Sequence, residues 1–268
     1  MQKTNEPGAT PIYTLNGEVI KEIKIPKIFS TPVRLDLIRK AVVAVQSTRL
    51  QPKGRDPAAG KKTSAKSMGV GLGTARIPRV KGRGSTRSGQ GAFAPGTVGG
   101  RLAHPPKVAK TLLKKINKKE RRSAIRSAIA ATADKNIVLK RGHKVPEDRP
   151  IPIILEDELE NVRTARDIRN VLFTLGLEDD LKRVKNGSRI RSGKGKMRGR
   201  KRKQPKGPLI VVDKDNGIRN AASNIPGVDV VFVKRLNAEM LAPGTHPGRL
   251  TLWSEAAVKR LHDANLFS

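Results

Sequence analysis

The stretch Leu209-Ile210-Val211-Val212 is a short aliphatic run, and Val228-Asp229-Val230-Val231-Phe232-Val233 follows it after one intervening segment. Similar runs occur at Ile137-Val138-Leu139 and at Ile151-Pro152-Ile153-Ile154-Leu155. Short runs rich in β-branched residues and bounded by turn-forming residues are typical of buried parallel strands. The sequence therefore predicts four strands in a mainly parallel sheet.

Segments with helical patterns lie among these expected strands. They cover residues 164–176, 216–222, 237–241 and 254–264. We expect the last helix to begin at Ser254 and to bury an apolar side made of Ala257, Val258, Leu261 and Leu266. This alternation of strands and helices is typical of an α/β layered sheet.

The N-terminal part adds a hairpin and a helix, and a further helix follows much later. Residues 11–25 predict a β-hairpin around a two-residue Asn16-Gly17 turn. Thr31 and Pro32 have the pattern of an N-cap and a first helical position, for a helix that runs toward Ser47. Asn117-Lys118-Lys119-Glu120 resembles a capping box. The helix that it opens should pack with one side, Ala124, Ile125, Ala128 and Ile129, and offer the other, Arg121, Arg122 and Arg126, to phosphate.

The charge of the chain is large and unevenly distributed. The 268 residues include 56 Lys and Arg against 23 Asp and Glu, a net charge of +33. Between Thr48 and Arg126 there are 21 basic residues and two acids, and between Lys182 and Gly207 there are 13 basic residues and no acid. The remaining 22 basic and 21 acidic residues nearly cancel. A charge of this size implies a polyanionic partner, and its location indicates a nearly neutral globular body with two basic excursions.

The two excursions differ in composition. Residues 50–106 hold 12 of the 25 glycines and one aromatic residue, Phe93, so we expect an extended loop that orders only on its partner. Residues 182–207 are shorter and denser in charge, with Gly and Ser interleaved, which favours binding to a phosphate backbone over a solvated face or a localisation tail. The expected globular domain is discontinuous, over 1–49 and 107–268.

Several classes of protein and site are disfavoured. The chain has no cysteine, which excludes disulfides and thiolate sites, and aromatic residues make up 3%, too few for a base-stacking platform. No apolar run is long enough to span a membrane, and residues 1–7 contain no apolar signal region, so we expect a cytosolic protein.

Motifs that could carry chemistry are incomplete. The glycines of 69–73 lack the dinucleotide-binding spacing, and 213–217 reads better as a turn after a strand than as a calcium loop. The acidic stretch 156–160 is interpreted as a solvated helix start, and the four histidines are scattered along the chain. We therefore expect no catalytic residue, no metal site and no cofactor.

The loop and its flanks resemble a known family. The segments 76–84, 101–107 and 117–121, and further along 141–145, 224–230 and 241–250, are similar to the archaeal form of the large-subunit ribosomal protein L-four family. The likeness covers essentially the whole chain in one order.

This resemblance implies a three-layer α/β/α domain on the outside of the large ribosomal subunit. The loop would pass inward through rRNA, support early subunit assembly and help to line the polypeptide exit tunnel. Its tip, which would meet the nascent polypeptide, would be Arg76, Ile77, Pro78, Arg79, Val80 and Lys81, and 101–107 would anchor the return. The other implied partners are neighbouring ribosomal proteins. We expect no membrane and no homo-oligomer.

The expected rRNA-binding residues are basic side chains of the two excursions and their flanks, since Arg and Lys form charge-assisted bonds to phosphate. They are Arg55, Lys61, Lys62, Lys66, Arg76, Arg79, Lys81, Arg83, Arg87, Arg101, His104, Lys107, Lys114, Lys115, Lys118, Arg121, Arg122, Arg189, Arg191, Lys194, Lys196, Arg198, Arg200, Lys201 and Arg202.

Three functions are consistent with these features. The first is a structural rRNA-binding protein without catalysis. The second is an RNA-modifying enzyme whose basic segments hold substrate, which the missing phosphate or dinucleotide loop disfavours. The third is a nucleoid-type protein, which would bind duplex DNA and structured RNA with similar affinity.

Overall fold

The computed structural model describes residues 9–264 and 267. These residues form two compact units. The globular unit contains the described residues up to Ser47 and from Lys114 onward, and the loop unit is Thr48–Leu113.

The globular unit is built on a six-stranded sheet with the strand order β2-β1-β3-β8-β6-β7. All neighbouring strands are parallel except β1 and β2, which form an antiparallel hairpin at one edge. The α/β fold class with a mainly parallel sheet is therefore confirmed. The strands are β1 Ala9–Tyr13, β2 Val19–Lys24, β3 Ile153–Leu155, β6 Leu209–Val212, β7 Asp229–Phe232 and β8 Thr251–Ser254.

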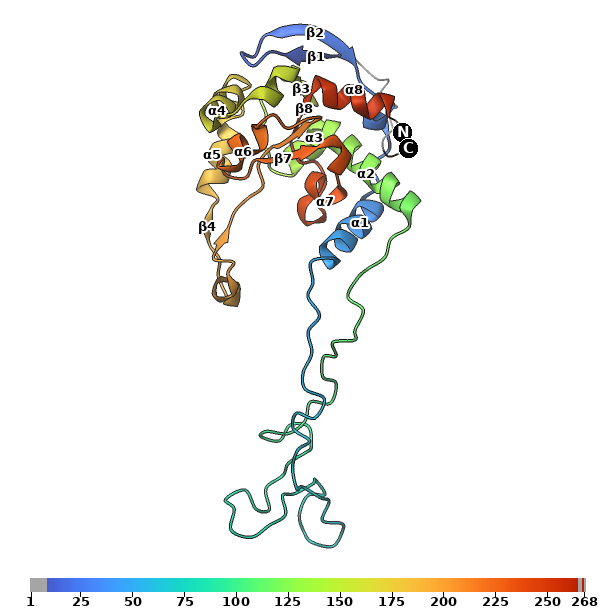
Figure 1. Cartoon of the computed structure of the whole chain (residues 1–268), viewed down its shortest axis with the longest axis vertical. Coiled ribbons are helices and arrows are strands. Elements are labelled where there is room, and N and C mark those ends of the chain that lie inside the picture. The colour runs from blue at the N-terminus through green and yellow to red at the C-terminus, as the bar shows by residue number, and fades with distance from the viewer. Residues whose placement is uncertain (1–8, 265–266, 268) are drawn as a thin grey trace. The chain divides into compact units, whose positions relative to one another are not determined.

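Helices cover the two faces of this sheet, as Figure 1 shows with α4 to α6 on the left and α1, α2 and α8 on the right. Their bounds are α1 Leu35–Ser47, α2 Lys118–Ala133, α3 Lys135–Lys140, α4 Ala165–Thr174, α5 Glu178–Asn186, α6 Ile218–Ser223, α7 Ala238–Leu241 and α8 Glu255–Asp263.

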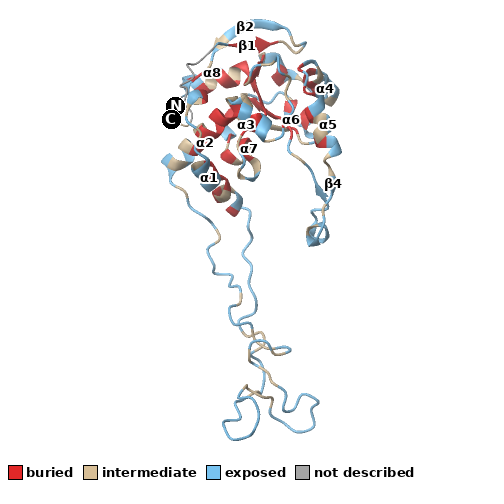
Figure 2. Cartoon of the chain, turned by 180° about the vertical axis from the view of Figure 1, so that it is seen from behind, coloured by how far each residue is buried: buried red, intermediate tan, exposed pale blue. Residues whose placement is uncertain are grey.

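Two hydrophobic cores result because successive strand residues point to opposite faces. Trp253, Ile154 and Val211 pack with α1, α2 and α8, while their neighbours Leu252 and Ile153 pack with α4 and α6. Figure 2 shows the buried residues concentrated in the sheet and in the inner faces of these helices. The sheet is thus the middle layer of three.

The sheet differs from the prediction at two places. β8 lies between β3 and β6 and is entirely buried, although the sequence analysis did not assign it. Conversely, 137–139 was expected to be a strand but lies in α3, because Asp134 caps that helix by accepting from the Asn136 backbone N–H at 2.9 Å. Only Val138 of this run is fully buried, as suits one face of a helix.

The N-terminal elements are present with shifted ends. The hairpin turn is longer than two residues, since Tyr13 pairs with Val19 and the Thr14 N–H donates to the Glu18 carbonyl. Helix α1 begins at Leu35 rather than after Thr31, because Ser127 Oγ of α2 donates to the Pro32 carbonyl and accepts from the Arg34 N–H. The preceding chain is thereby held outside the helix.

Two further predicted N-caps differ, since Ser254 forms a side-chain hydrogen bond to its helix and Asn117 does not. Ser254 caps α8 as expected, accepting from the Ala257 N–H at 3.2 Å, while Leu266 lies outside the described residues. Asn117 occupies the N-cap position of α2 without a side-chain bond, whereas Glu120 pairs with Lys40 at 2.8 Å and also accepts from the Asn117 backbone N–H, so one half of the expected capping box is present. As expected, α2 buries Ala124, Ile125, Ala128 and Ile129 and exposes Arg121 and Arg122; Arg126 is half-buried.

A glycine just before β8 gives a test of this packing. Gly248 has φ +83°, and a Cβ there would lie 2.7 Å from Ile137 Cγ2 and 2.8 Å from the Ile137 carbonyl oxygen. Gly248→Ala should therefore lower the free energy of unfolding by roughly 2–4 kcal/mol, from backbone strain plus overpacking. Gly142→Ala is the control, because Gly142 has φ +96° with open space around it and should show the strain alone. Equal losses in urea unfolding would contradict this account.

No helix in the described part of the chain is long and apolar enough to cross a membrane.

Candidate nucleic-acid interface

Backbone hydrogen bonds in the loop unit centre on the segment 77–81. Arg79 and Lys66 exchange backbone hydrogen bonds at 3.0 Å, and on the other side the Val80 N–H donates to Gln90 at 3.0 Å and the Ala92 N–H to Pro78 at 2.9 Å. The expected tip residues thus form the middle of three adjacent segments. Within this unit Arg76 and Lys81 are exposed, whereas residues 77–80 are half-buried.

The outgoing and returning limbs of the loop unit are held together by their backbones. The Arg55 N–H donates to the Pro106 carbonyl at 3.1 Å. A Cβ on Gly54 would lie 2.5 Å from Val108 Cγ2, and one on Gly60, which has φ +76°, would lie 2.4 Å from the Gly100 carbonyl oxygen. The close approach of the limbs therefore depends on glycine and leaves the basic side chains available for other contacts.

Most basic side chains of the loop unit point into solvent. The unit contains 14 Lys and Arg and a single acid, Asp56, whose Oδ2 lies 3.6 Å from Lys62 Nζ. Arg79 and Arg101 are half-buried: Arg79 Nη1 donates to the Gly89 carbonyl at 2.8 Å, and the Arg101 guanidinium lies 5.7 Å from the Phe93 ring centroid. The other expected binding residues of this unit are exposed, namely Arg55, Lys61, Lys62, Lys66, Arg76, Lys81, Arg83, Arg87, His104 and Lys107.

The expected binding residues next to the loop unit belong to the globular unit. Lys114, Lys115, Lys118, Arg121 and Arg122 lead into α2 or lie in its first turns, and all five are exposed.

The second basic tract forms a narrow hairpin, which we call the arm and define as residues 189–203. Its strands β4 (Arg189–Ile190) and β5 (Arg202–Lys203) are antiparallel, and a 3-10 turn over Lys194–Arg198 joins them. Figure 1 shows β4 leading away from α5 and the sheet. The expected binding residues Arg189, Lys194, Lys196, Arg198, Arg200, Lys201 and Arg202 are exposed, and Arg191 is half-buried, with its N–H donating to the Lys201 carbonyl.

The arm is shorter than the basic tract 182–207 because the ends of the tract belong to the globular body. Residues 182–186 complete α5, Val184 is in contact with Gly207 and Gly227, and Gly207 is buried. Ion pairs of the tract occur at these ends, Lys182 with Glu178 and Lys206 with Asp229. Among the described residues, no carboxylate lies within ion-pair distance of a basic side chain of the arm.

A network of buried and half-buried polar side chains holds the chain at the base of the arm. We call it the clamp and define it as His143, Asp180, Arg183, Asp229 and Arg249. Asp180 is fully buried and accepts from His143 Nδ1 at 3.2 Å, the Lys144 N–H at 3.0 Å and Arg183 Nε at 2.9 Å. Arg183 precedes the arm in the chain and Lys206 follows it, and Arg183 Nη2 donates to the Lys206 carbonyl at 2.9 Å. The network therefore fixes the chain where it leaves and re-enters the globular unit.

Arg249 extends this clamp into the core. It is fully buried, and Nη2 lies 2.6 Å from Asp229 Oδ2, which also accepts from Lys206 Nζ at 2.9 Å. Arg249 Nε donates to the Gly207 carbonyl at 2.9 Å and Nη1 to the Met240 carbonyl at 3.1 Å. Sequence reasoning missed this residue, since nothing local distinguishes a buried arginine from a phosphate-binding one.

The pKa values in the clamp follow from burial and charge. Burial lowers the pKa of His143, and although Asp180 raises it, the guanidinium groups of Arg183 and Arg141 reinforce the lowering. Burial alone would raise the pKa of Asp180, but the bonds from His143 and Arg183 lower it on balance. The folded clamp is therefore an ionised carboxylate beside a neutral imidazole.

This arrangement predicts a pH dependence of stability. The pKa of His143 is lower in the folded state than the ~6.5 of an unfolded chain, so below pH ~6.5 the unfolded state binds more protons and stability decreases as pH falls. We expect the urea midpoint to fall between pH 7.5 and 5, and His143→Gln to remove part of that slope. Asp180 does not contribute to this pH range. Because its pKa is lowered in the folded state, the stability that its carboxylate contributes is lost only as pH falls below ~4, the ordinary pKa of Asp. Parallel pH profiles for the two proteins would contradict the prediction.

The acidic stretch 156–160 was expected to be a solvated helix start, but several of its carboxylates bond to the protein itself. Glu160 is buried and accepts from the Asp213 N–H at 2.7 Å, the Lys214 N–H at 3.1 Å and Ser254 Oγ at 2.8 Å. Glu156 accepts from the Leu15 N–H and Asp157 from the Ala256 N–H. These carboxylates satisfy backbone donors just after three strands, which is a structural role.

Most of the chain is similar to proteins of one known family. The model of the family described as "Ribosomal protein L4/L1 family" matches residues 23–264. A curated relative named "Large ribosomal subunit protein uL4", from Methanosphaera stadtmanae, is 52% identical over 252 residues, which covers 94% of this chain and 95% of the relative. Proteins of the same name from Saccharolobus islandicus strains M.14.25 and M.16.27 are each 50% identical over 253 residues, covering 94% of this chain and 93% of theirs.

Proposed function

Since the chain belongs to the ribosomal protein L4/L1 family, we propose that it is a structural constituent of the large ribosomal subunit that binds large-subunit rRNA through the loop unit and the arm. The family is one of ribosomal proteins and not of enzymes. In this proposal the globular domain, 1–49 with 107–268, carries the loop 50–106 and the tract 182–207, supports early assembly of the subunit, and works in the cytoplasm.

The distribution of paired and unpaired charges supports rRNA binding most strongly. Several basic side chains of the globular body have carboxylate partners within it, as in Lys21 with Glu255, Lys40 with Glu120 and Arg249 with Asp229. The loop unit has one acid for 14 basic residues, and the arm has none for nine. Unmatched cations on segments with little core of their own are the feature that a phosphate backbone would neutralise.

Sedimentation tests this proposal. A cell extract is separated on a gradient and the large-subunit fraction is washed at high salt. We expect the chain to stay with that fraction at one copy per subunit, because a loop enclosed by RNA cannot dissociate as a surface-bound cation would. Absence from the fraction, or release at low salt, would overturn the proposal.

The finer part of the proposal concerns the exit tunnel, with Arg76–Lys81 facing the nascent polypeptide. The exposure of Arg76 and Lys81 within the loop unit is compatible with such a contact. A photo-crosslinker at position 76 should capture a stalled nascent chain, whereas one at Lys196 of the arm, which is also exposed, should not. Capture from both positions, or from neither, would contradict a tunnel location for this segment.

A further inference from the structure

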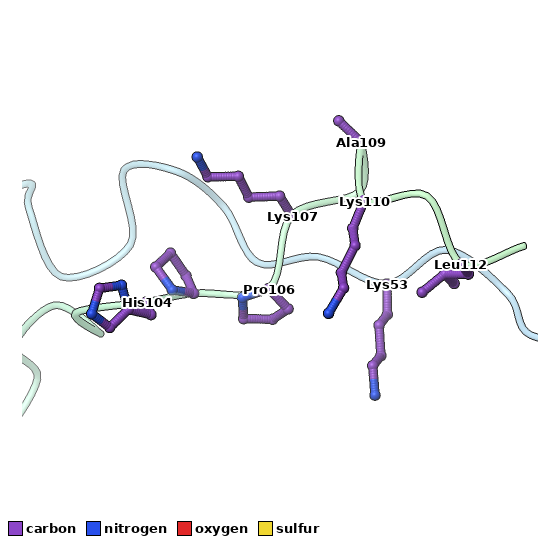
Figure 3. Close-up of a pocket in the computed structure, with 8 residues that line it drawn as sticks. Lys53, His104, Pro106, Lys107, Ala109, Lys110 and Leu112 are labelled. Atoms are coloured by element: carbon purple, nitrogen blue, oxygen red, sulfur yellow. The ribbon is translucent and has the colours of Figure 1, made fainter. Parts of the chain in front are cut away.

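A cavity of about 600 Å³ lies within the loop unit, where the outgoing limb passes the returning one. It is lined by Lys53 of the outgoing limb and by His104, Pro106, Lys107 and Lys110 of the returning limb, with Leu112 at its end (Figure 3). Its volume is within the range of small-molecule sites, roughly 300–1,000 Å³. Lys53 and Lys110 were not among the residues expected to bind rRNA.

The walls of this cavity are fixed by the backbone. The bond from the Arg55 N–H to the Pro106 carbonyl joins the limbs at 3.1 Å, and the Lys110 N–H closes a turn onto the Lys107 carbonyl at 3.2 Å. Gly54 lies next to Lys53 in the chain. A Cβ on Gly54 would lie 2.5 Å from Val108 Cγ2, so the limbs can approach this closely only with glycine at that position. The lining side chains are therefore not needed to hold the limbs together and can serve a ligand.

The chemistry of the lining is divided into two parts. Figure 3 shows the Lys53 and Lys110 side chains pointing to the same side, while Lys107 points to the opposite side. The single acid of the unit, Asp56, lies against Lys62, so within this unit no carboxylate offsets the two ammonium groups. Figure 3 shows Pro106 on the His104 side of Lys110, and the His104 imidazole farther along the returning limb. Two unopposed cations at one end of the cavity, followed by an apolar ring and an imidazole, suit a phosphate with an attached base.

We propose that this cavity binds one unstacked nucleotide of the large-subunit rRNA, with its phosphate held by Lys53 and Lys110 and its base lying on His104 and Pro106. The inference rests on the proposed function, because it assigns a specific contact to the loop unit. Unpaired RNA bases that leave a helix are commonly held by stacking on ring side chains, including histidine. The site differs from the rest of the loop unit, where exposed cations can bind phosphate without recognising a base.

The test uses the full chain bound to a large-subunit rRNA transcript, with 2′-hydroxyl reactivity measured at every nucleotide. His104→Ala should change the reactivity of one or two adjacent nucleotides, and His104→Phe should restore the wild-type pattern because its ring can stack. Lys53→Ala/Lys110→Ala should change the same nucleotides and lower the slope of log K against log salt by about 0.7–0.9, because the two side chains share one phosphate.

Lys107→Ala is the matched control, since it removes a cation from the same cavity on the opposite side. It should leave the reactivity of those nucleotides unchanged, even if it lowers the salt slope. Changes at unrelated nucleotides in the His104 and Lys53/Lys110 variants, or no change in either, would overturn the inference while the wild-type chain still binds. Failure of the wild-type chain to prefer the rRNA over duplex DNA would instead overturn the proposed function.

Discussion

Replacing the arm, residues 189–203, with a short Gly-Ser linker should flatten the salt dependence of rRNA binding more than any other change of similar size. The segment carries nine Lys and Arg, which lack carboxylate partners among the described residues. Each phosphate contact contributes roughly 0.7–0.9 to the slope of log K against log salt. If half of the nine make a contact, the slope should fall by about 3–4, which nitrocellulose filter binding between 50 and 200 mM salt would measure.

The structure makes this deletion cleaner than removal of the whole tract 182–207. Arg189 pairs with Lys203, so the cut ends lie side by side, and no residue of the arm is buried. Replacing all nine basic residues with Gln is the companion variant, which keeps the hairpin length and should give the same slope. An unchanged slope in both variants would show that the arm is solvated rather than bound to RNA.

Arg249→Met should cost the globular unit about 3–5 kcal/mol of unfolding free energy, since it removes a fully buried guanidinium that pairs with the half-buried Asp229 and donates to backbone carbonyls. Burial would raise the pKa of Asp229, yet Arg249 and Lys206 lower it on balance, so its carboxylate is ionised in the folded state. Without Arg249 that charge retains only Lys206, and the Gly207 and Met240 carbonyls lose a donor. Urea unfolding followed by the fluorescence of Trp253, the single tryptophan and fully buried in β8, measures the loss.

The control for Arg249→Met is Lys182→Met. Lys182 pairs with Glu178 at 2.9 Å, but both side chains are more than half exposed and lie four residues apart on α5. Water and salt screen such an exposed pair, so its loss should hardly change the free energy of unfolding. If the two variants lost similar stability, Arg249 would not be the clamp that its contacts indicate.

Composition and short apolar runs were sufficient to predict the strands β3, β6 and β7, and the family resemblance is confirmed by the match over 23–264. β8 was missed because Thr251 and Ser254 interrupt its apolar pattern. Both are nevertheless buried, since Thr251 Oγ1 accepts from Trp253 Nε1 at 3.1 Å and Ser254 Oγ donates to Glu160. The partner of Ser254 lies 94 residues away in sequence, so no local window contains it.

The basic segments of the candidate interface were visible in the sequence because charge density is a local property. The clamp was not, because Arg249, Asp229 and Asp180 act on one another across the fold. The limits of the arm could not be predicted for a related reason. The segments around Lys182 and Lys206 also carry basic residues, as the arm does. They belong to the globular body because Val184 packs against Gly207 and Gly227.

The central claim, that the two basic segments bind rRNA while the sheet carries them, is tested most directly by mapping ultraviolet protein–RNA crosslinks on purified large subunits. Crosslinked peptides should come from 48–126 and from the arm, including the cavity residue Lys53 or Lys110, and not from β1, β2 or α8. Crosslinks that cluster on those elements, with none in the loop unit or the arm, would contradict the account.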